Sequence, residues 1–143
     1  VLDVSGSMSG KPIEELNKGL QDFYNEISSD DTTSQRLEVS LITFSHVVQT
    51  LQEPALVENF TMPTLIASGS TAMVNAVNEA IDKVASRKQW YKSTNQAYYR
   101  PWIILMTDGE PDRSRGRKHE STGQDSGEYP TNETARNKVQ FFL

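Results

Sequence analysis

The sequence predicts a single α/β domain, built on a mostly parallel, doubly wound sheet with helices on both faces. Short runs of apolar and β-branched residues alternate with longer segments whose apolar residues recur every three or four positions. Alternation of strands with amphipathic helices is typical of α/β sheets. The length of 143 residues suits one hydrophobic core and leaves little room for two.

The first half of the chain predicts a strand end, a helix and a hairpin. Residues 1–4 form the end of a buried strand, and Pro12 suits the first turn of the helix that follows. Residues 28–34 are a polar loop, 37–44 a buried strand, and 47–51 an edge strand paired with it. The helix is expected to bury one apolar stripe, made of Ile13, Leu16, Leu20, Phe23 and Ile27.

The second half predicts one more helix and one more strand. Residues 53–67 are expected to be irregular because Pro54 and Pro63 oppose regular structure. Residues 68–71 should cap a helix, and 85–100 form a polar, mildly basic connection to a buried strand at 102–106. The apolar stripe expected on this helix consists of Met73, Val74, Val77, Ala80, Ile81 and Val84.

The last third is dominated by a hydrophilic segment. Residues 112–132 are interpreted as a loop or insertion, and a helical pattern resumes at 133–143. The chain starts at Val1 without a methionine and closes on Phe141-Phe142-Leu143. We interpret residues 1–143 as one incomplete domain, a piece of a longer polypeptide in which the C-terminal part of the fold is missing.

Composition excludes several classes of protein. The absence of cysteine removes disulfides and thiolate metal sites, and it fits a reducing compartment. No apolar run is long enough to cross a membrane, and the net charge of -5 disfavours a nucleic-acid surface built on global charge. His46 and His119 fall in a predicted turn and in the hydrophilic segment, and both are expected to be solvated.

Oxygen-bearing side chains follow three of the predicted elements. Asp3, Ser5 and Ser7 alternate along an extended segment, so they point the same way after the first strand. Thr71 stands at a helix start, and Asp108 follows the apolar strand. Open α/β sheets place ligands at the carboxyl ends of their strands. Each residue alone is common turn or cap material, but the five together predict one oxygen cage for a hard cation such as Mg²⁺.

This arrangement resembles the von Willebrand factor A domain and its metal-ion-dependent adhesion site. The matching residues are Asp3, Ser5 and Ser7 in an Asp-x-Ser-x-Ser loop, a distant Thr71, and Asp108 in a Thr-Asp-Gly context. The resemblance implies a Rossmann-like fold and a Mg²⁺ site, with Mn²⁺ or Ca²⁺ as alternatives. It also implies a protein partner that presents an acidic side chain to the ion, and a binding module that is not an enzyme.

The resemblance extends to one branch of the family and to the rim of the site. Lys11-Pro12-Ile13, Leu41-Ile42-Thr43-Phe44 and Met106-Thr107-Asp108-Gly109-Glu110-Pro111 are similar to the bacterial tellurium-resistance branch, whose members are cytoplasmic. The residues expected to support the ligands or to contact the partner are Gly6, Met8, Ser70, Gly109 and Glu110.

Two other functions stay open at this point. A metal-dependent hydrolase or phosphatase would use the ion as a Lewis acid, with Glu110 or Asp112 as the nearby base. A single-stranded nucleic-acid module would use the cations and aromatics of 87–92 with Tyr98, Tyr99 and Arg100. No residue is identified that would activate either carboxylate as a base. The net negative charge of the chain makes a nucleic acid the weaker hypothesis for the partner.

Overall fold

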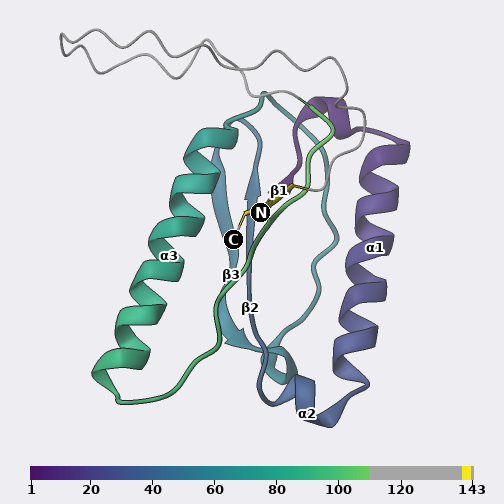
Figure 1. The fold of residues 1–143 in the computed structure, drawn as a ribbon. Coiled ribbons are helices and arrows are strands. Elements are labelled where there is room, and N and C mark those ends of the chain that lie inside the picture. The colour runs from purple at the N-terminus through teal and green to yellow at the C-terminus, as the bar shows by residue number, and fades with distance from the viewer. Residues whose placement is uncertain (110–139, 143) are drawn as a thin grey trace, which may run out of the picture.

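A computed structural model describes residues 1–109 and 140–142, with side chains for the first of these two ranges. Two long helices flank a set of strands (Figure 1). The predicted segment 112–132 lies outside the described residues. The elements are β1 (Leu2–Asp3), α1 (Lys11–Ser28), α2 (Asp31–Ser34), β2 (Glu38–Phe44), β3 (Val48–Leu56), α3 (Met73–Ser93), β4 (Ile103–Leu105) and β5 (Gln140–Phe142).

The sheet is mixed in its described part, whereas the sequence predicted mostly parallel strands. β1 runs parallel to β2, and β2 pairs antiparallel with β3 because a tight turn joins them. β4 lies beside β1 in parallel, through one bridge between Leu2 and Met106 and the bond from the Asp3 amide to the Met106 carbonyl at 2.9 Å. β4 also pairs antiparallel with β5, so 140–142 form a strand and not the predicted helix.

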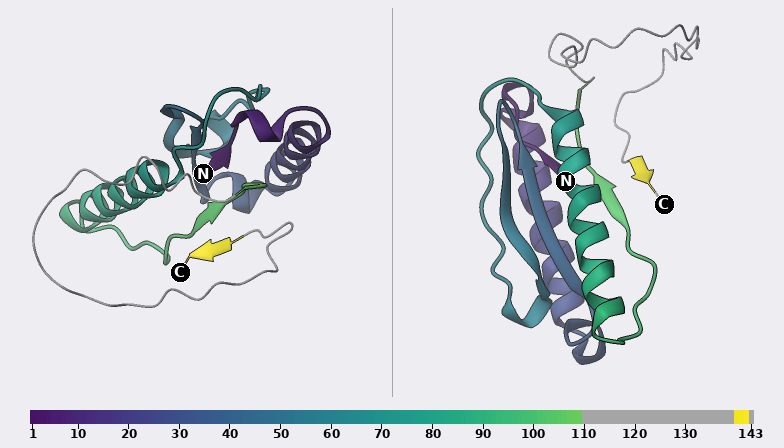
Figure 2. Two further views of the ribbon diagram at one scale, coloured as in Figure 1. Left: turned by 90° about the horizontal axis from the view of Figure 1, so that it is seen from above. Right: turned by 90° about the vertical axis from the view of Figure 1, so that its left-hand side faces the viewer.

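The two long helices cover opposite faces of the strands (Figure 2). Neighbouring residues of β2 show the alternation, since Leu41 packs on the α1 side and Ile42 on the α3 side. The cluster on the α1 side comprises Leu2, Met8, Leu16, Leu20, Leu41, Phe60 and Leu65. The cluster on the α3 side comprises Ile42, Phe44, Ala76, Ala80 and Leu105. The molecule is therefore an α/β layer structure, as predicted.

The helix stripes are partly shifted from their predicted positions. In α1, Leu16 and Leu20 are buried as expected, but Phe23 is 43% exposed. Tyr24 takes its place, with its ring 5.9 Å from that of Phe60. The spacing of four from Leu20 to Tyr24 keeps both side chains on one face, because adjacent helical residues differ by about 100°.

In α3 the residues that contact the sheet are small. Ala76 and Ala80 are buried, whereas Val74 is 56% exposed and Ile81 is 50% exposed. The helix begins at Met73 after an Ala72 cap that makes no side-chain bond, so 68–71 do not cap it. It continues to Ser93, so most of the predicted connection at 85–100 is helical.

Pro54 lies inside a strand, contrary to the prediction that it opposes regular structure. β3 reaches Leu56, and its register against β2 shifts between the pairs Val39–Ala55 and Leu41–Gln52. Glu53 and Pro54 are the two β3 residues within this irregularity, where proline costs no ladder hydrogen bond. The polar segment 28–34 likewise contains the short helix α2, which the Asp30 carboxylate caps. Within the described residues, no helix has the length and apolarity needed to span a bilayer.

Candidate metal centre

Three loops meet at one end of the strands. The 3₁₀ turn at Gly6–Met8 follows β1, the segment 68–72 precedes α3, and 107–109 follow β4. Figure 1 shows these three segments together at the upper end, where the β2–β3 hairpin also turns. This is the carboxyl end of β1 and β4, the edge at which the sequence placed the candidate ligands.

Asp3 is a buried carboxylate held by neutral donors. Its exposed fraction is 0%. One carboxylate oxygen, Oδ1, accepts the Ser5 amide at 2.8 Å, and the other, Oδ2, accepts the Thr107 hydroxyl at 2.5 Å. The ion pairs in the described part of the chain lie elsewhere, at Lys83 and Arg87. A buried charge without a cationic partner is costly. A metal ion is the kind of partner that would offset this cost.

A row of hydrogen-bonded oxygens leads from the buried loop to the surface. The Ser5 and Ser7 hydroxyls are 3.1 Å apart, and Ser7 donates to Oδ1 of Asp108 at 2.9 Å. Ser5 is 2% exposed, whereas Ser7 and Asp108 are exposed. The structure therefore brings four of the five predicted ligands together, since Asp3 joins the row through the Ser5 amide. The row ends in an accessible carboxylate.

Thr71 is placed beside this row by its backbone neighbours. The Gly6 amide donates to the Gly69 carbonyl at 2.8 Å, and the Ala72 amide donates to the Ser45 carbonyl at 2.7 Å. Thr71 lies between these two anchors and is half-buried. In the described part of the chain no hydrogen bond links its hydroxyl to the other four predicted ligands. The structure thus places the segment 68–72, the Thr71 loop, against the Ser5–Ser7 loop through the backbone bond from Gly6 to Gly69.

The residues predicted at the rim separate into two groups. Gly6, Ser70 and Gly109 are exposed near the candidate ligands, and the Gly109 amide donates to the Thr107 hydroxyl at 3.2 Å. Met8 is 5% exposed and packs in the cluster under α1, so of the two roles predicted for it only support of the turn remains. Its buried side chain is therefore not available to a partner. Glu110 and Asp112 lie outside the described residues.

Two residues at this edge were missed as candidates. Thr107 donates to Asp3, although the sequence pattern assigns its hydroxyl no role beyond the Thr-Asp-Gly context. His46 is exposed, as expected, and its ring also lies beside Gly69. Its position in the turn after Phe44 is the only sequence signal, because that turn lies at the carboxyl end of the neighbouring strand β2.

The donor set suits a hard divalent cation. Carboxylate and hydroxyl oxygens are ligands for Mg²⁺ and Ca²⁺, whereas imidazole and thiolate favour softer metals. Within residues 1–109, no three side chains of His, Cys, Asp or Glu gather into a cluster. The candidate centre is consistent with this, since it combines two carboxylates with three hydroxyls.

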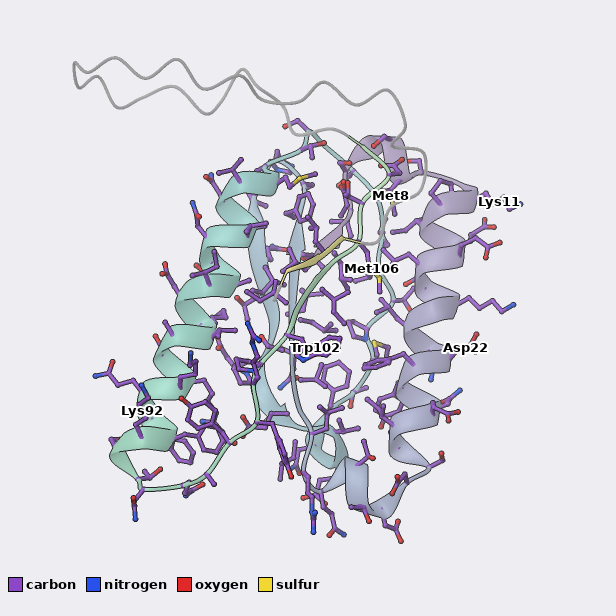
Figure 3. All side chains as sticks on the ribbon, viewed as in Figure 1. Met8, Lys11, Asp22, Lys92, Trp102 and Met106 are labelled. Carbon is purple, nitrogen blue, oxygen red and sulfur yellow. The ribbon has the colours of Figure 1, made fainter. Side chains whose placement is uncertain are left out.

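The basic and aromatic residues of α3 lie far from this centre. Lys92 is near the opposite end of the molecule from Met8 (Figure 3). Arg87 forms an ion pair with Glu38 and stacks over the Trp90 ring at 4.3 Å from its centroid. Because Arg87 already has a carboxylate partner, its charge serves to hold α3 on β2 rather than to bind phosphate.

An α/β sheet with oxygen ligands on the loops at its carboxyl edge defines a class of ligand-binding domain. The family model of the von Willebrand factor type A domain matches residues 1–127, so the chain belongs to this family. Domains of this family generally mediate protein–protein interactions and often bind a divalent metal. No curated protein matches the sequence.

Proposed function

We propose that this domain binds a protein partner through one divalent cation held by Asp3, Ser5, Ser7, Thr71 and Asp108. Mg²⁺ is the expected ion, with Mn²⁺ or Ca²⁺ as alternatives. The observation that carries the proposal is the buried Asp3 carboxylate, whose donors are neutral, beside a row of hydroxyls that ends at the surface. Further support comes from the hydrogen bonds that link Asp3, Ser5, Ser7 and Asp108 in one set.

The charges of the site residues support an acidic partner. Ser5, Ser7 and Thr71 contribute neutral oxygens, and Asp3 and Asp108 contribute one negative charge each, so the protein would neutralise a divalent cation without giving the site a net negative charge. When bound, the cation supplies a positive charge that can accept a carboxylate from the partner. Asp108 and Ser7 are exposed and border the accessible side. The rim residues Gly6, Ser70, Gly109 and Glu110 are the proposed partner contacts.

We further infer a binding role without catalysis, in the tellurium-resistance branch of the family and in the cytoplasm. The support for the branch is the sequence similarity at 11–13, 41–44 and 106–111. Of these segments, 41–44 belong to β2 and 106–109 follow β4 on the way to the candidate site. We also propose that the domain has a doubly wound sheet, with 112–132 as a hydrophilic loop or insertion.

Calorimetric titration with Mg²⁺ and Mn²⁺ tests the metal site. The wild type should bind one ion. Ser7→Ala should weaken binding on the order of tenfold or more by removing one ligand, and Asp3→Asn should abolish it. Ser9→Ala is the matched control, because Ser9 is exposed in the same loop but outside the hydrogen-bonded row. Unchanged binding in Ser7→Ala, which removes an exposed hydroxyl, would overturn the assignment.

Selection of displayed peptides tests the acidic partner. Peptides enriched by the domain in Mn²⁺ should carry Asp or Glu at a fixed position, and the enrichment should vanish in EDTA and in Ser7→Ala. Enrichment that persists in EDTA would show a binding surface independent of the ion. Enrichment of peptides without an acidic residue would contradict the proposed partner chemistry.

A further inference from the structure

His46 lies on the β2–β3 hairpin at the same edge as the candidate ligands. The hairpin is tied to the Thr71 loop, because the Ser45 carbonyl accepts the Ala72 amide at 2.7 Å. The Ser45 hydroxyl lies 3.2 Å from Nδ1 of His46, which fixes one edge of the imidazole. The side chain is exposed on its other side. The ring is therefore held by the hairpin and faces the segment that precedes Thr71.

The imidazole fills the space over Gly69. A Cβ atom at position 69 would stand 2.4 Å from Nδ1 of His46, closer than non-bonded heavy atoms approach. The φ angle of Gly69 is +82°, a conformation that side-chain-bearing residues rarely adopt. The φ angle of position 69 therefore favours glycine, and a side chain there would also displace the His46 ring.

Gly69 in turn is bonded to the Ser5–Ser7 loop that follows β1. Its carbonyl accepts the Gly6 amide at 2.8 Å, and a Cβ atom at Gly6 would stand 3.3 Å from that carbonyl oxygen. Gly6 separates Ser5 from Ser7 in the chain. Gly69 therefore contacts His46 on the hairpin and bonds to Gly6 in the Ser5–Ser7 loop. These two contacts connect the hairpin to the Thr71 loop, and the Thr71 loop to the two serines.

We propose that His46 is a positioning residue that holds the Thr71 loop in register with the Ser5–Ser7 loop. The imidazole acts by occupying space over Gly69, so that the segment 68–72 keeps the backbone bonds that flank Thr71. The effect on metal affinity rests on the proposed function. The effect on the backbone does not, and it is measurable without metal.

Amide hydrogen exchange followed by NMR in EDTA tests the positioning role directly. His46→Ala should speed exchange of the Gly6 and Ala72 amides by roughly tenfold, because both bonds lose their support. His46→Phe, which keeps a ring in the same place, should preserve protection. The Val57 amide, which donates to Leu37 at the far end of the sheet, should be unchanged in every variant. Val47→Ala is the matched hairpin control, since its side chain is also exposed.

A double-substitution cycle tests the contact with the ring. Gly69→Ala should disturb the Gly6 and Ala72 amides more in the wild type than in His46→Ala, because only the φ strain remains when the ring is absent. Equal effects in both backgrounds would overturn the proposal, and so would unchanged amides in His46→Ala. A His46→Phe variant that behaves like His46→Ala would refute packing as the cause.

Calorimetry then separates this inference from the proposed function. If the wild type binds Mg²⁺, His46→Ala should weaken binding on the order of tenfold while His46→Phe should not. A wild type that binds no ion refutes the metal site alone, because the exchange result is obtained in EDTA. Full metal affinity in His46→Ala together with faster exchange would refute the link between the Thr71 loop and the ion.

Discussion

The hydrogen bond from Thr107 to Asp3 predicts a large loss of stability from a nearly isosteric change. Thr107→Val replaces the hydroxyl by a methyl group and removes the donor to Oδ2 of Asp3, which lies at 2.5 Å. Asp3 is 0% exposed, so water has no direct route to the orphaned oxygen. The hydroxyl also accepts the Gly109 amide at 3.2 Å, but Gly109 is exposed and water can replace that bond.

The magnitude follows from the charge of the acceptor. A hydrogen bond to a charged group contributes about 1.5–3 kcal/mol to the free energy of unfolding. Most of this contribution is lost when the donor is removed and the buried acceptor has no other partner. We therefore expect Thr107→Val to lower the free energy of unfolding by about 2 kcal/mol. For a domain of this size, that corresponds to a fall of roughly 6–10 °C in Tm.

Urea denaturation in EDTA measures this change, with Thr43→Val as the matched control. Thr43 is 4% exposed, and its hydroxyl reaches only the neutral carbonyl of Gln49, at 3.4 Å. Its loss should therefore cost less than about 1 kcal/mol. The dependence on urea concentration should stay the same in both variants. A loss below about 0.5 kcal/mol in Thr107→Val, or equal losses in both, would show that Thr107 does not support the buried charge.

Two further predictions concern contacts that hold the scaffold. The ion pair and hydrogen bonds from Arg87 lower the pKa of Glu38 below its ordinary value of 4.5. This stabilisation is present above that value and is lost as pH falls through the lowered pKa. Arg87→Met should therefore cost about 1 kcal/mol near neutral pH, and urea midpoints should fall less steeply on acidification than in the wild type. Asn17→Leu should cost about 1–3 kcal/mol in the same assay, because the Asn17 amide bonds both the N–H and the C=O of Leu65.

The strands were the best-predicted part of the fold. The run at 37–44 contains β-branched and apolar residues bounded by polar ones, and β2 occupies Glu38–Phe44. The neighbouring edge strand was also predicted, although it is longer than expected. Its extension through Pro54 depends on an irregular register between two strands. The residue pattern of one strand does not indicate how it pairs with its neighbour. From the pattern alone, proline therefore predicts the end of the strand.

The helix faces were predicted only in part, because packing distance selects the residues as well as hydrophobicity. α3 turns Ala76 and Ala80 toward β2 and β4, and leaves the larger Val74 and Ile81 half exposed. Small side chains allow a helix backbone to approach a sheet closely. An apolar stripe chosen by hydrophobicity favours the larger residues, so the sequence gives the period of the helix more reliably than its orientation.

The candidate ligands follow from local sequence patterns, whereas the contacts that His46 and Thr107 make near them do not. Asp3, Ser5, Ser7 and Asp108 belong to short local patterns that a sequence displays directly. His46 supports the site through a contact with Gly69, and nothing in the spacing of 46 and 69 indicates that the two residues meet. Such contacts arise from the way a hairpin and a loop pack together, which is a property of the folded chain.

Thr107 and Asp108 are adjacent in the chain, and they bond to opposite ends of the row of oxygens. Successive side chains of an extended segment point to opposite sides. After β4 the hydroxyl of Thr107 reaches inward to the buried Asp3, while the carboxylate of Asp108 accepts the exposed Ser7 hydroxyl. The bonds of Thr107 and Asp108 therefore join the loop after β4 to the loop after β1 at a buried point and at an exposed point. A shift of this segment by one residue would exchange the two roles, placing a carboxylate against a carboxylate at Asp3, and repulsion between buried like charges opposes that register.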